Sequence, residues 1–323
     1  MEKIKVSVIG TGHLGSIHAK LWHKNENAIL QGIYDIDRDK AAKLSAEYNC
    51  RAFGSVDEAI DESDILTIAA PTSEHYAIAK KCIEQKKHCL IEKPITAKYE
   101  EAVLLIALAR ENGVSIQVGH VERFNPAISA LKNYKIEPLF IETHRLSQFS
   151  PRATDVSVIH DLMIHDIDIM LWLVKSEVVS VDAKCVSVLT DTPDIANARI
   201  KFANGAVANI TASRISARPM RKTRIFQKDA YISIDFASKE VEVYRLDDGE
   251  SARIIPATML GSIESGTKNR NIYFEKPPVE EVNAIAEEQQ QFIDALTQGQ
   301  PIPVRAEEAA EALRIAEEIA AQR

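Results

Sequence analysis

The sequence is poor in cysteine and has no long apolar run. Its four cysteines, Cys50, Cys82, Cys89 and Cys185, form no CxxC pair and no metal-ligand spacing. No apolar stretch reaches the roughly 18 residues that a membrane-spanning helix needs. We therefore expect no disulfide framework, no metal site and no membrane span. Since no leader-like segment precedes the first strand pattern, we also expect a reduced, cytoplasmic protein.

Basic residues are outnumbered by acidic ones. The chain has 39 Lys and Arg against 47 Asp and Glu, which gives a formal net charge of −8 at pH 7. This balance disfavours a broad surface for nucleic acid or anionic membranes, although it leaves room for a local basic site. With 46% hydrophobic and 27% charged residues, the composition is that of an ordinary globular protein. We expect its partners to be small molecules.

Two hydrophobic patterns divide the chain, whose 323 residues exceed the usual size of one core. From residue 4 to about 119, short apolar runs alternate with segments of helical period, which predicts a parallel sheet covered by helices. The strands are expected at 4–9, 29–34, 65–70, 88–91 and 115–118, and the helices at 14–24, 37–48, 74–86 and 97–112.

After residue 170 the alternation has a period of two residues, which predicts antiparallel strands at 181–189, 198–202 and 207–212. Asn204-Gly205 lies between two of these runs, and both residues accept a positive φ, so we expect a tight hairpin turn. The segment 251–280 lacks clear periodicity and is expected to contain a long loop.

A glycine-rich segment, Gly10 to Gly15, follows the first predicted strand and opens the first predicted helix. In this context the GxGxxG spacing is typical of a dinucleotide pyrophosphate site. Gly10 permits the tight turn, Gly12 lets the backbone approach the phosphates, and Gly15 lets helix and strand pack closely. Without its context the motif is weak, because glycine-rich turns occur in many loops.

The second predicted strand ends at Asp35, twenty residues after Gly15. A carboxylate at this point hydrogen-bonds the adenosine ribose in dinucleotide folds, so Asp35 favours NAD. NADP remains an alternative, because Arg38 can partly offset the repulsion of a 2′-phosphate. A second alternative is that Asp35 only caps the following helix.

Lys93 closes another predicted strand in the run Glu92-Lys93-Pro94. Pro94 favours an extended backbone at Lys93, so we expect the ammonium to project from the carboxyl edge of the sheet, which is the edge where open α/β sheets bind ligands. Taken alone, a lysine in so short a motif is more often a solvated surface residue.

The segment 158–168 carries two histidines and three aspartates among apolar residues. On a straight helix Asp161, His165 and Asp168 fall within about 60° of one another. Histidine exchanges a proton near neutral pH, and a carboxylate one turn away can orient it. Two alternatives are a core histidine capped by Asp161 and a metal site that includes His160, which points about 140° away from His165.

Taken together, these segments resemble the Gfo/Idh/MocA oxidoreductase family. The resemblance is carried by six segments: Ala70-Pro71-Thr72-Ser73-Glu74-His75, Lys87 to Pro94, Gln117 to Pro126, Asp161-x-x-x-His165-x-x-Asp168, Phe292 to Leu296, and Pro301 to Val304. It implies a Rossmann dinucleotide-binding domain over 1–119 and, over 120–323, an α+β substrate and oligomerisation domain with a large, mainly antiparallel open sheet. The C-terminal helix is a candidate to pack back on the first domain.

The resemblance also implies the site residues. Lys93 would polarise the reacting oxygen, His165 would take the proton and Asp161 would position the substrate. Cofactor binding is expected at Gly10, Gly12, His13, Leu14, Gly15, Asp35, Ala70, Pro71, Thr72, His75, Glu92 and Lys93. One departure is the run Asp155 to His160, where the family often has glycines.

The segments Gly119 to Pro126 and Asp194 to Arg199 are similar to the branch of the family that oxidises UDP-N-acetylhexosamines at ring carbon 3. Five basic residues, Arg214, Arg218, Arg221, Lys222 and Arg224, follow a predicted strand and suit an anionic substrate, although a solvated loop or a subunit contact explains them as well. Substrate contacts are expected from Lys93, Arg123, Asn125, Arg152, Asp161, His165, Arg214 and Arg218. The competing functions are a dehydrogenase of a free polyol or sugar, such as inositol, and a cofactor-binding sensor. We expect a homodimer or homotetramer formed through the sheet of the second domain.

Overall fold

The computed structural model describes residues 3–150, 156–247, 256–265 and 268–322. The chain divides into two compact units. Unit 1 comprises Met1–Val121 and Asn283–Arg314, and unit 2 comprises Glu122–Val282 and Ile315–Arg323. No helix in the described part of the chain is both long and apolar enough to cross a bilayer.

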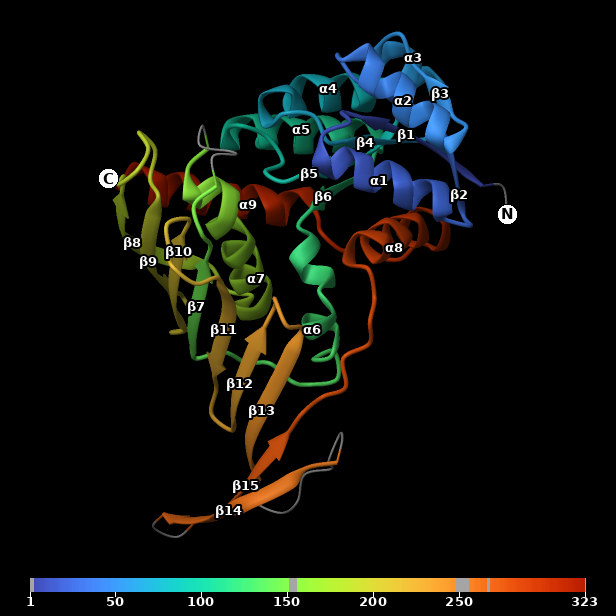
Figure 1. Cartoon of the computed structure of the whole chain (residues 1–323). Helices are drawn as coiled ribbons and strands as arrows, with labels where there is room; N and C mark the ends of the chain where they lie inside the picture. The colour runs from blue at the N-terminus through green and yellow to red at the C-terminus, as the bar shows by residue number, and fades with distance from the viewer. Residues whose placement is uncertain (1–2, 151–155, 248–255, 266–267, 323) are drawn as a thin grey trace. The chain divides into compact units, whose positions relative to one another are not determined.

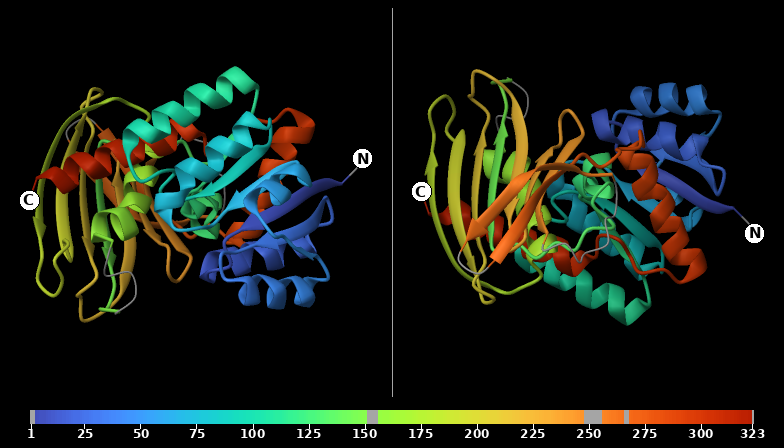
Figure 2. Two further views of the ribbon diagram at one scale, coloured as in Figure 1. Left: turned by 90° about the horizontal axis from the view of Figure 1, so that it is seen from above. Right: turned by 90° about the horizontal axis from the view of Figure 1, so that it is seen from below.

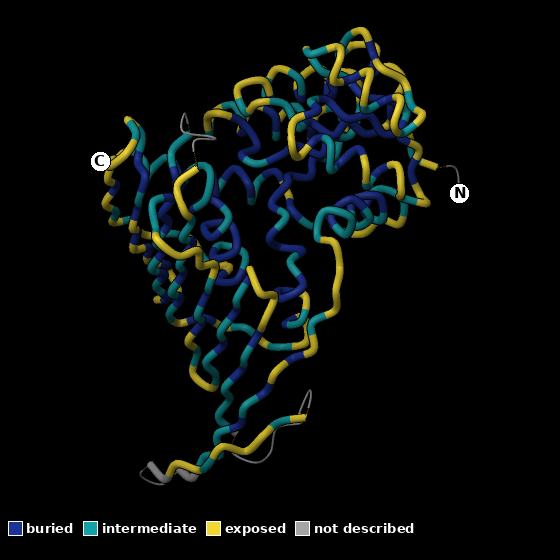
Figure 3. Tube along the Cα trace, in the orientation of Figure 1, coloured by how far each residue is buried: buried dark blue, intermediate teal, exposed yellow. Residues whose placement is uncertain are grey.

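Unit 1 is built on a six-stranded parallel sheet (Figure 1). Its strands are β1 (Ile4–Ile9), β2 (Ala28–Tyr34), β3 (Arg51–Ala52), β4 (Ile65–Ile68), β5 (His88–Glu92) and β6 (Ile116–Gly119). They lie in the order β3-β2-β1-β4-β5-β6. Most residues of the central strands are apolar and buried, which fits a sheet with helices on both faces, and Figure 3 shows this burial.

Seven helices contribute to this unit: α1 (His13–Lys24), α2 (Arg38–Tyr48), α3 (Val56–Asp61), α4 (Thr72–Glu84), α5 (Tyr99–Asn112), α8 (Ala284–Gln298) and the first part of α9 (Ala306–Ala321). α1 packs against α8 on one side of the sheet, and α4 packs against α5 on the other (Figure 1). Trp22 of α1 and Phe292 of α8 are fully buried in one core cluster with Val6 and Val8 of β1. The helix α8, near the C-terminal end of the chain, thus completes the core of unit 1.

Unit 2 is built on a nine-stranded sheet. Its strands are β7 (Phe140–Leu146), β8 (Val178–Val186), β9 (Ile195–Phe202), β10 (Val207–Ser213), β11 (Met220–Phe226), β12 (Ala230–Asp235), β13 (Glu240–Asp247), β14 (Thr258–Ser265) and β15 (Lys268–Glu275). They lie in the order β14-β15-β13-β12-β11-β7-β10-β9-β8, and each neighbouring pair except β7 with β10 is antiparallel. The predicted combination of a parallel and a mainly antiparallel sheet is therefore confirmed.

The hairpin expected at Asn204-Gly205 joins β9 to β10. Gly205 has a φ of 87°, a conformation that glycine adopts without strain. Phe202 N–H donates to the carbonyl of Ala206 at 2.9 Å, and the Asn204 side chain accepts from Ala206 N–H at 3.0 Å. These bonds set the register in which Val207 pairs with Lys201.

The prediction of a long loop within 251–280 is wrong for much of that range, because β14 and β15 form a hairpin there. β14 is an edge strand, and its register shifts between Met259 and Gly261. Met259, Leu260 and Ile263 are exposed. An edge strand with an irregular register buries no regular face, so its sequence shows no alternation of period two.

A helical segment lies along one face of this sheet, against β7 and β10 (Figure 2). It consists of η2 (Ile159–Met163), which is a π-helical turn, followed by α7 (Ile164–Val174). Two short helices, η1 (Val121–Phe124) and α6 (Pro126–Ser129), precede β7. A single π-helical turn inside a helix is often found at a functional site.

Candidate functional site

The strand order of unit 1 brings four predicted binding segments to one edge of the sheet. β2, β1, β4 and β5 are neighbours and parallel, so their carboxyl ends lie side by side. These ends are followed by Asp35, by the glycine-rich segment, by Ala70 and by Lys93, respectively. Segments up to 83 residues apart in sequence, from Gly10 to Lys93, therefore meet at the edge where open α/β sheets bind ligands.

The glycine-rich loop has the geometry that a dinucleotide needs. Gly10 has a φ of 95°, and a Cβ on it would lie 2.6 Å from the carbonyl oxygen of Ala69. Gly12 begins α1 without a side-chain cap, and a Cβ there would meet no atom within 4 Å. The space beside Gly12 is therefore open, and the first N–H groups of a helix have no partner within the helix, which together suit a phosphate. His13 and Leu14 are exposed in the first turn.

Asp35 is tied to this loop. Its Oδ2 accepts from the backbone N–H and the hydroxyl of Thr11, both at 2.6 Å, and its Oδ1 accepts from Asp37 N–H at 2.8 Å. Burial alone would raise the pKa of Asp35, but these hydrogen bonds outweigh it and hold the pKa below its ordinary value. The helix-cap alternative is wrong, because Asp37 caps α2 by accepting from Lys40 N–H.

His75 and Glu92 make their polar contacts within unit 1. The ring nitrogens of His75 lie 2.9 Å from the carbonyl oxygens of Pro94 and Ala70. Burial holds the pKa of this histidine below its ordinary value. Glu92 contacts His18 through Oε1 at 2.8 Å and accepts from Lys93 N–H through Oε2 at 3.2 Å. Both residues shape the loops around the sheet edge, and their contact with a cofactor stays a prediction.

Lys93 follows β5 and is half-buried. The Lys93–Pro94 peptide bond is cis. The backbone N–H of Lys93 is held by the Glu92 carboxylate, and the Pro94 carbonyl is held by His75. The lysine therefore stands on a backbone segment that is anchored on both sides.

In unit 2, the predicted catalytic pair stands on the π-helical turn and the helix after it. Asp161 lies in η2 and His165 in the first turn of α7, and both are half-buried. The straight-helix spacing used for the prediction is wrong across η2, because a π turn has more residues per turn than an α-helix. His160 lies beside Ser157, with 2.9 Å between Nδ1 and the hydroxyl. Among the described residues no cluster of three metal-ligating side chains occurs.

Asp168, which was expected on the same helix face as Asp161 and His165, is more deeply buried than either of them. It is buried and accepts two hydrogen bonds from the Arg123 guanidinium, at 2.8 and 2.6 Å. The other aspartate of the helix, Asp166, forms an equivalent buried pair with Arg145, with both bonds at 2.9 Å. Arg145 also donates to Glu122 at 2.9 Å. The aspartates of this segment thus divide into two that fix α7 in the core and Asp161, which is half-buried.

The predicted substrate residues of unit 2 are largely occupied by contacts inside the unit. The Arg214 guanidinium is buried and donates to Asp194 at 2.8 Å and to the Val156 carbonyl at 2.7 Å. Asn125 caps α6 by accepting from Ala127 N–H at 3.0 Å. Arg218 is exposed, and Arg152 lies outside the described residues. The first role of Arg123, Asn125 and Arg214 is therefore to hold the fold, and their contact with substrate stays a prediction.

Three other basic residues of the same cluster lie on β11 and face acidic partners. Lys222 lies 3.2 Å from Asp235, Arg224 lies 2.8 Å from Glu142, and Arg221 lies 3.9 Å from Glu122. These three residues therefore lie on a strand beside acidic side chains, and the alternative of a solvated loop does not apply to them. Exposed pairs of this kind contribute little to stability.

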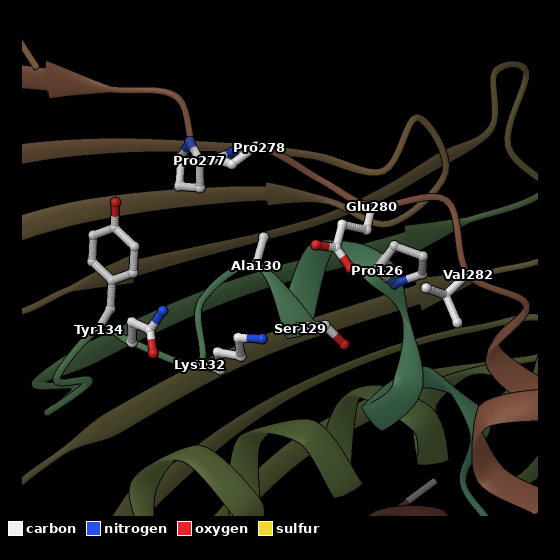
Figure 4. A pocket seen from close by; sticks show the side chains of 10 residues that line it. Pro126, Ser129, Ala130, Lys132, Tyr134, Pro277, Pro278, Glu280 and Val282 are labelled. Carbon is white, nitrogen blue, oxygen red and sulfur yellow. The ribbon is translucent and has the colours of Figure 1, made fainter. Parts of the chain in front are cut away.

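A pocket of about 310 Å³ opens in unit 2 beside α6 (Figure 4). Tyr134 and Pro277 stand on opposite sides of it, and none of the predicted catalytic residues lines it. Lining residues are Pro126, Ser129, Ala130, Lys132, Asn133, Tyr134, Pro277, Pro278, Glu280 and Val282. The pocket does not change the assignment of the site.

The sequence analysis missed the buried residues that support the site. Arg145 lies on the inward face of β7, in phase with Ile141 and Thr143, so an arginine in an apolar alternation was the available signal. His18 was missed as well. It is fully buried on α1, three residues after Gly15, and its position on the apolar face of the predicted helix could have flagged it.

The chain matches two family models. Residues 4–120 match the oxidoreductase family with an NAD-binding Rossmann fold, and residues 135–233 match the GFO/IDH/MocA C-terminal domain. The chain is 42% identical over 250 residues to UDP-N-acetylglucosamine 3-dehydrogenase of Acidithiobacillus ferrooxidans, which covers 77% of this chain and 79% of that protein. The match to inositol 2-dehydrogenase of Rubrobacter xylanophilus is 28% over 187 residues, 55% of this chain and 54% of that one.

The fold agrees with these matches. A solved structure of UDP-N-acetylglucosamine 3-dehydrogenase from Acidithiobacillus ferrooxidans is similar with a TM-score of 0.88 and 35% identity, covering 100% of this chain and 98% of that chain. Two family models and a relative of 42% identity cover both the parallel and the antiparallel sheet. The chain therefore belongs to the GFO/IDH/MocA family of NAD-binding oxidoreductases.

Proposed function

We propose that the protein oxidises a sugar ring hydroxyl, at carbon 3 of a UDP-N-acetylhexosamine. The observation that carries this proposal is the 42% identity to UDP-N-acetylglucosamine 3-dehydrogenase, against 28% to inositol 2-dehydrogenase over a shorter stretch. The chain keeps Lys93, Asp161 and His165, which argues for turnover rather than for a cofactor-binding sensor.

We propose NAD as the cofactor. The uncapped start of α1 at Gly12 would hold the phosphates, and Asp35 would accept from a ribose hydroxyl, because its Oδ1 has a single hydrogen bond here. The Arg38 guanidinium, which would be needed for a 2′-phosphate, donates to the carbonyls of Phe53 and Gly54. When bound, NAD supplies the acceptor for the hydride.

The chemistry of the chain's own residues follows from their types. His165 removes the hydroxyl proton as a general base, and the ammonium of Lys93 stabilises the negative charge that develops on that oxygen. Asp161 orients the substrate.

The substrate assignment is tested by comparing a nucleotide sugar with the corresponding free sugar. With NAD in excess and NADH absorbance at 340 nm as the signal, UDP-N-acetylglucosamine is expected to exceed free N-acetylglucosamine in kcat/KM by at least about tenfold. The reason is that each lost hydrogen bond to a charged group costs roughly 1.5–3 kcal/mol. The loss should appear in kcat as well as in KM, because binding energy from remote parts of a substrate also lowers the barrier at the reacting carbon.

Two outcomes would change the proposal. Comparable efficiency on free sugar or inositol would move the choice to a polyol dehydrogenase. NADH binding without turnover of any sugar, nucleotide sugar or polyol would support the sensor. A higher salt concentration should weaken the binding of an anionic nucleotide sugar, whereas the binding of an uncharged sugar or polyol should stay the same.

The preference for NAD is tested at Asp35. The unmodified protein is expected to use NAD better than NADP, and Asp35→Ser should narrow or reverse that preference, since the ribose loses a charged acceptor worth roughly 1.5–3 kcal/mol. The measurement is kcat/KM for both cofactors. Asp39→Ser, an exposed aspartate on α2, serves as the matched control. Equal efficiency with both cofactors before any mutation would refute this assignment.

We also propose that the sheet of unit 2 forms the contact between identical subunits. A row of aromatic rings crosses five of its strands, with centroid distances from 5.0 to 5.7 Å. The row consists of Phe140, Phe226, Tyr231, Tyr244 and Phe274, and these side chains are half-buried or exposed. Interfaces are enriched in such residues. Sedimentation velocity at micromolar concentration tests the proposal, and a monomer would contradict it.

A further inference from the structure

A buried hydrogen-bonded chain connects α1 to the backbone of Lys93. His18 is fully buried, and its Nε2 lies 2.8 Å from Oε1 of Glu92. The other oxygen of Glu92 accepts from Lys93 N–H at 3.2 Å. One carboxylate therefore joins a side chain of the cofactor-loop helix to the main chain of the proposed electrophilic lysine.

The protonation state of His18 follows from its other neighbour. Gln289 of α8 donates from Nε2 to the His18 carbonyl at 3.2 Å, which identifies this atom as the amide nitrogen. The same nitrogen lies 3.1 Å from Nδ1 of His18, so Nδ1 accepts a hydrogen bond. Nε2 then carries the hydrogen atom and donates a hydrogen bond to Glu92.

The surroundings are shaped to keep Glu92 in place. Gly119 pairs with Glu92 across β5 and β6, and a Cβ at Gly119 would lie 2.9 Å from Oε2. Burial alone would raise the pKa of Glu92, but the bond from His18 and the Lys93 neighbour hold it below its ordinary value. A charged carboxylate that is only 7% exposed is thus retained at the base of the lysine.

We propose that His18 is a positioning residue for Lys93 and acts through Glu92. Its imidazole holds the carboxylate, and the carboxylate holds the backbone N–H of the lysine. The link starts on the helix that the glycine-rich loop opens, so the placement of the lysine is tied to the placement of that loop. This inference rests on the proposed function, which gives Lys93 its part in the reaction.

A double-mutant cycle tests the inference. His18→Leu is expected to lower kcat by up to roughly 10²-fold, because a small misplacement of a catalytic group can cost that much. In a Lys93→Ala background the same substitution should have little further effect, since the group that it positions is gone. His18→Gln keeps a donor to Glu92 and should recover most of the rate. Equal losses from His18→Leu in both backgrounds would overturn the proposal.

A second measurement needs no turnover. Trace acetylation with acetic anhydride, read by mass spectrometry, should label Lys93 several-fold faster in His18→Leu than in the unmodified protein. The exposed Lys132 is the internal reference and should not change. Unchanged labelling of Lys93 would also overturn the proposal. If no sugar is oxidised at all, the proposed function fails, whereas the labelling still decides the part played by His18.

Discussion

Replacing His165 with alanine is expected to lower kcat by about 10²–10⁴-fold and to leave NADH binding intact. The imidazole is the one side chain of the pair on η2 and α7 that exchanges a proton near neutral pH, whereas Asp161 orients the substrate. The loss of turnover should be seen at every pH between 6 and 9. Steady-state kinetics and NADH fluorescence titration, both across that range, measure the two effects.

His23→Ala is the matched control, because His23 is an exposed histidine near the end of α1 and should keep the unmodified rate. Lys93→Ala is expected to lose turnover in the same way as His165→Ala, since the developing alkoxide loses its cation. If His165→Ala keeps the unmodified turnover from pH 6 to 9, the assignment of the base is wrong.

The parallel sheet of unit 1 could be predicted in detail because its signals are local. The central strands are mostly apolar and buried, as in β1 and β4, and helices such as α1 and α8 show a one-sided pattern. The predicted strand 4–9 coincides with β1, and the predicted helix 97–112 ends with α5 at Asn112. The two-residue strand β3 and the short helix α3 were missed because they are too short to show a period.

The predicted site depended on a different kind of evidence. Gly10, Asp35 and Lys93 could be assigned from their positions at strand ends, since the order of a parallel sheet then brings them together. The buried pairs of Arg123 with Asp168 and of Arg145 with Asp166 could not be predicted, because the two residues of each pair lie 45 and 21 positions apart in the sequence. Spacing along a helix therefore could not show that Asp168 is buried against Arg123.

The π-helical turn at 159–163 has no local signature either. One extra residue in a turn is set by packing on β10 and by the buried pairs after it rather than by helix propensity. The series of hydrogen bonds from His18 through Glu92 to Lys93 also has no signature in the local sequence. Its members come from α1, β5 and α8, and nothing in their sequence spacing relates residue 18 to residues 92 and 289.

Replacing Glu288 with glutamine is expected to stabilise the protein, by a margin that widens as the pH rises from 5 to 8. Glu288 is fully buried on α8, and neither of its carboxylate oxygens has a hydrogen-bond partner among the described residues. Burial, together with the negative charge of Glu92, raises the pKa of Glu288 well above its ordinary value. The carboxyl group is therefore protonated in the folded protein over a range in which it is ionised in the unfolded chain.

The sign of the effect follows from linkage. Because the folded pKa is the higher one, the stability is complete below the ordinary pKa of glutamate and falls as the pH rises toward the folded pKa. Each pH unit in that interval costs the unmodified protein about 1.4 kcal/mol, whereas glutamine has no proton to lose. Urea unfolding midpoints at pH 5, 6, 7 and 8 measure the difference. Glu281→Gln, an exposed glutamate just before α8, should give a difference that does not change with pH. A flat difference for Glu288→Gln as well, or a loss of stability at pH 8, would show that Glu288 is ionised in the fold and has a partner that compensates its charge.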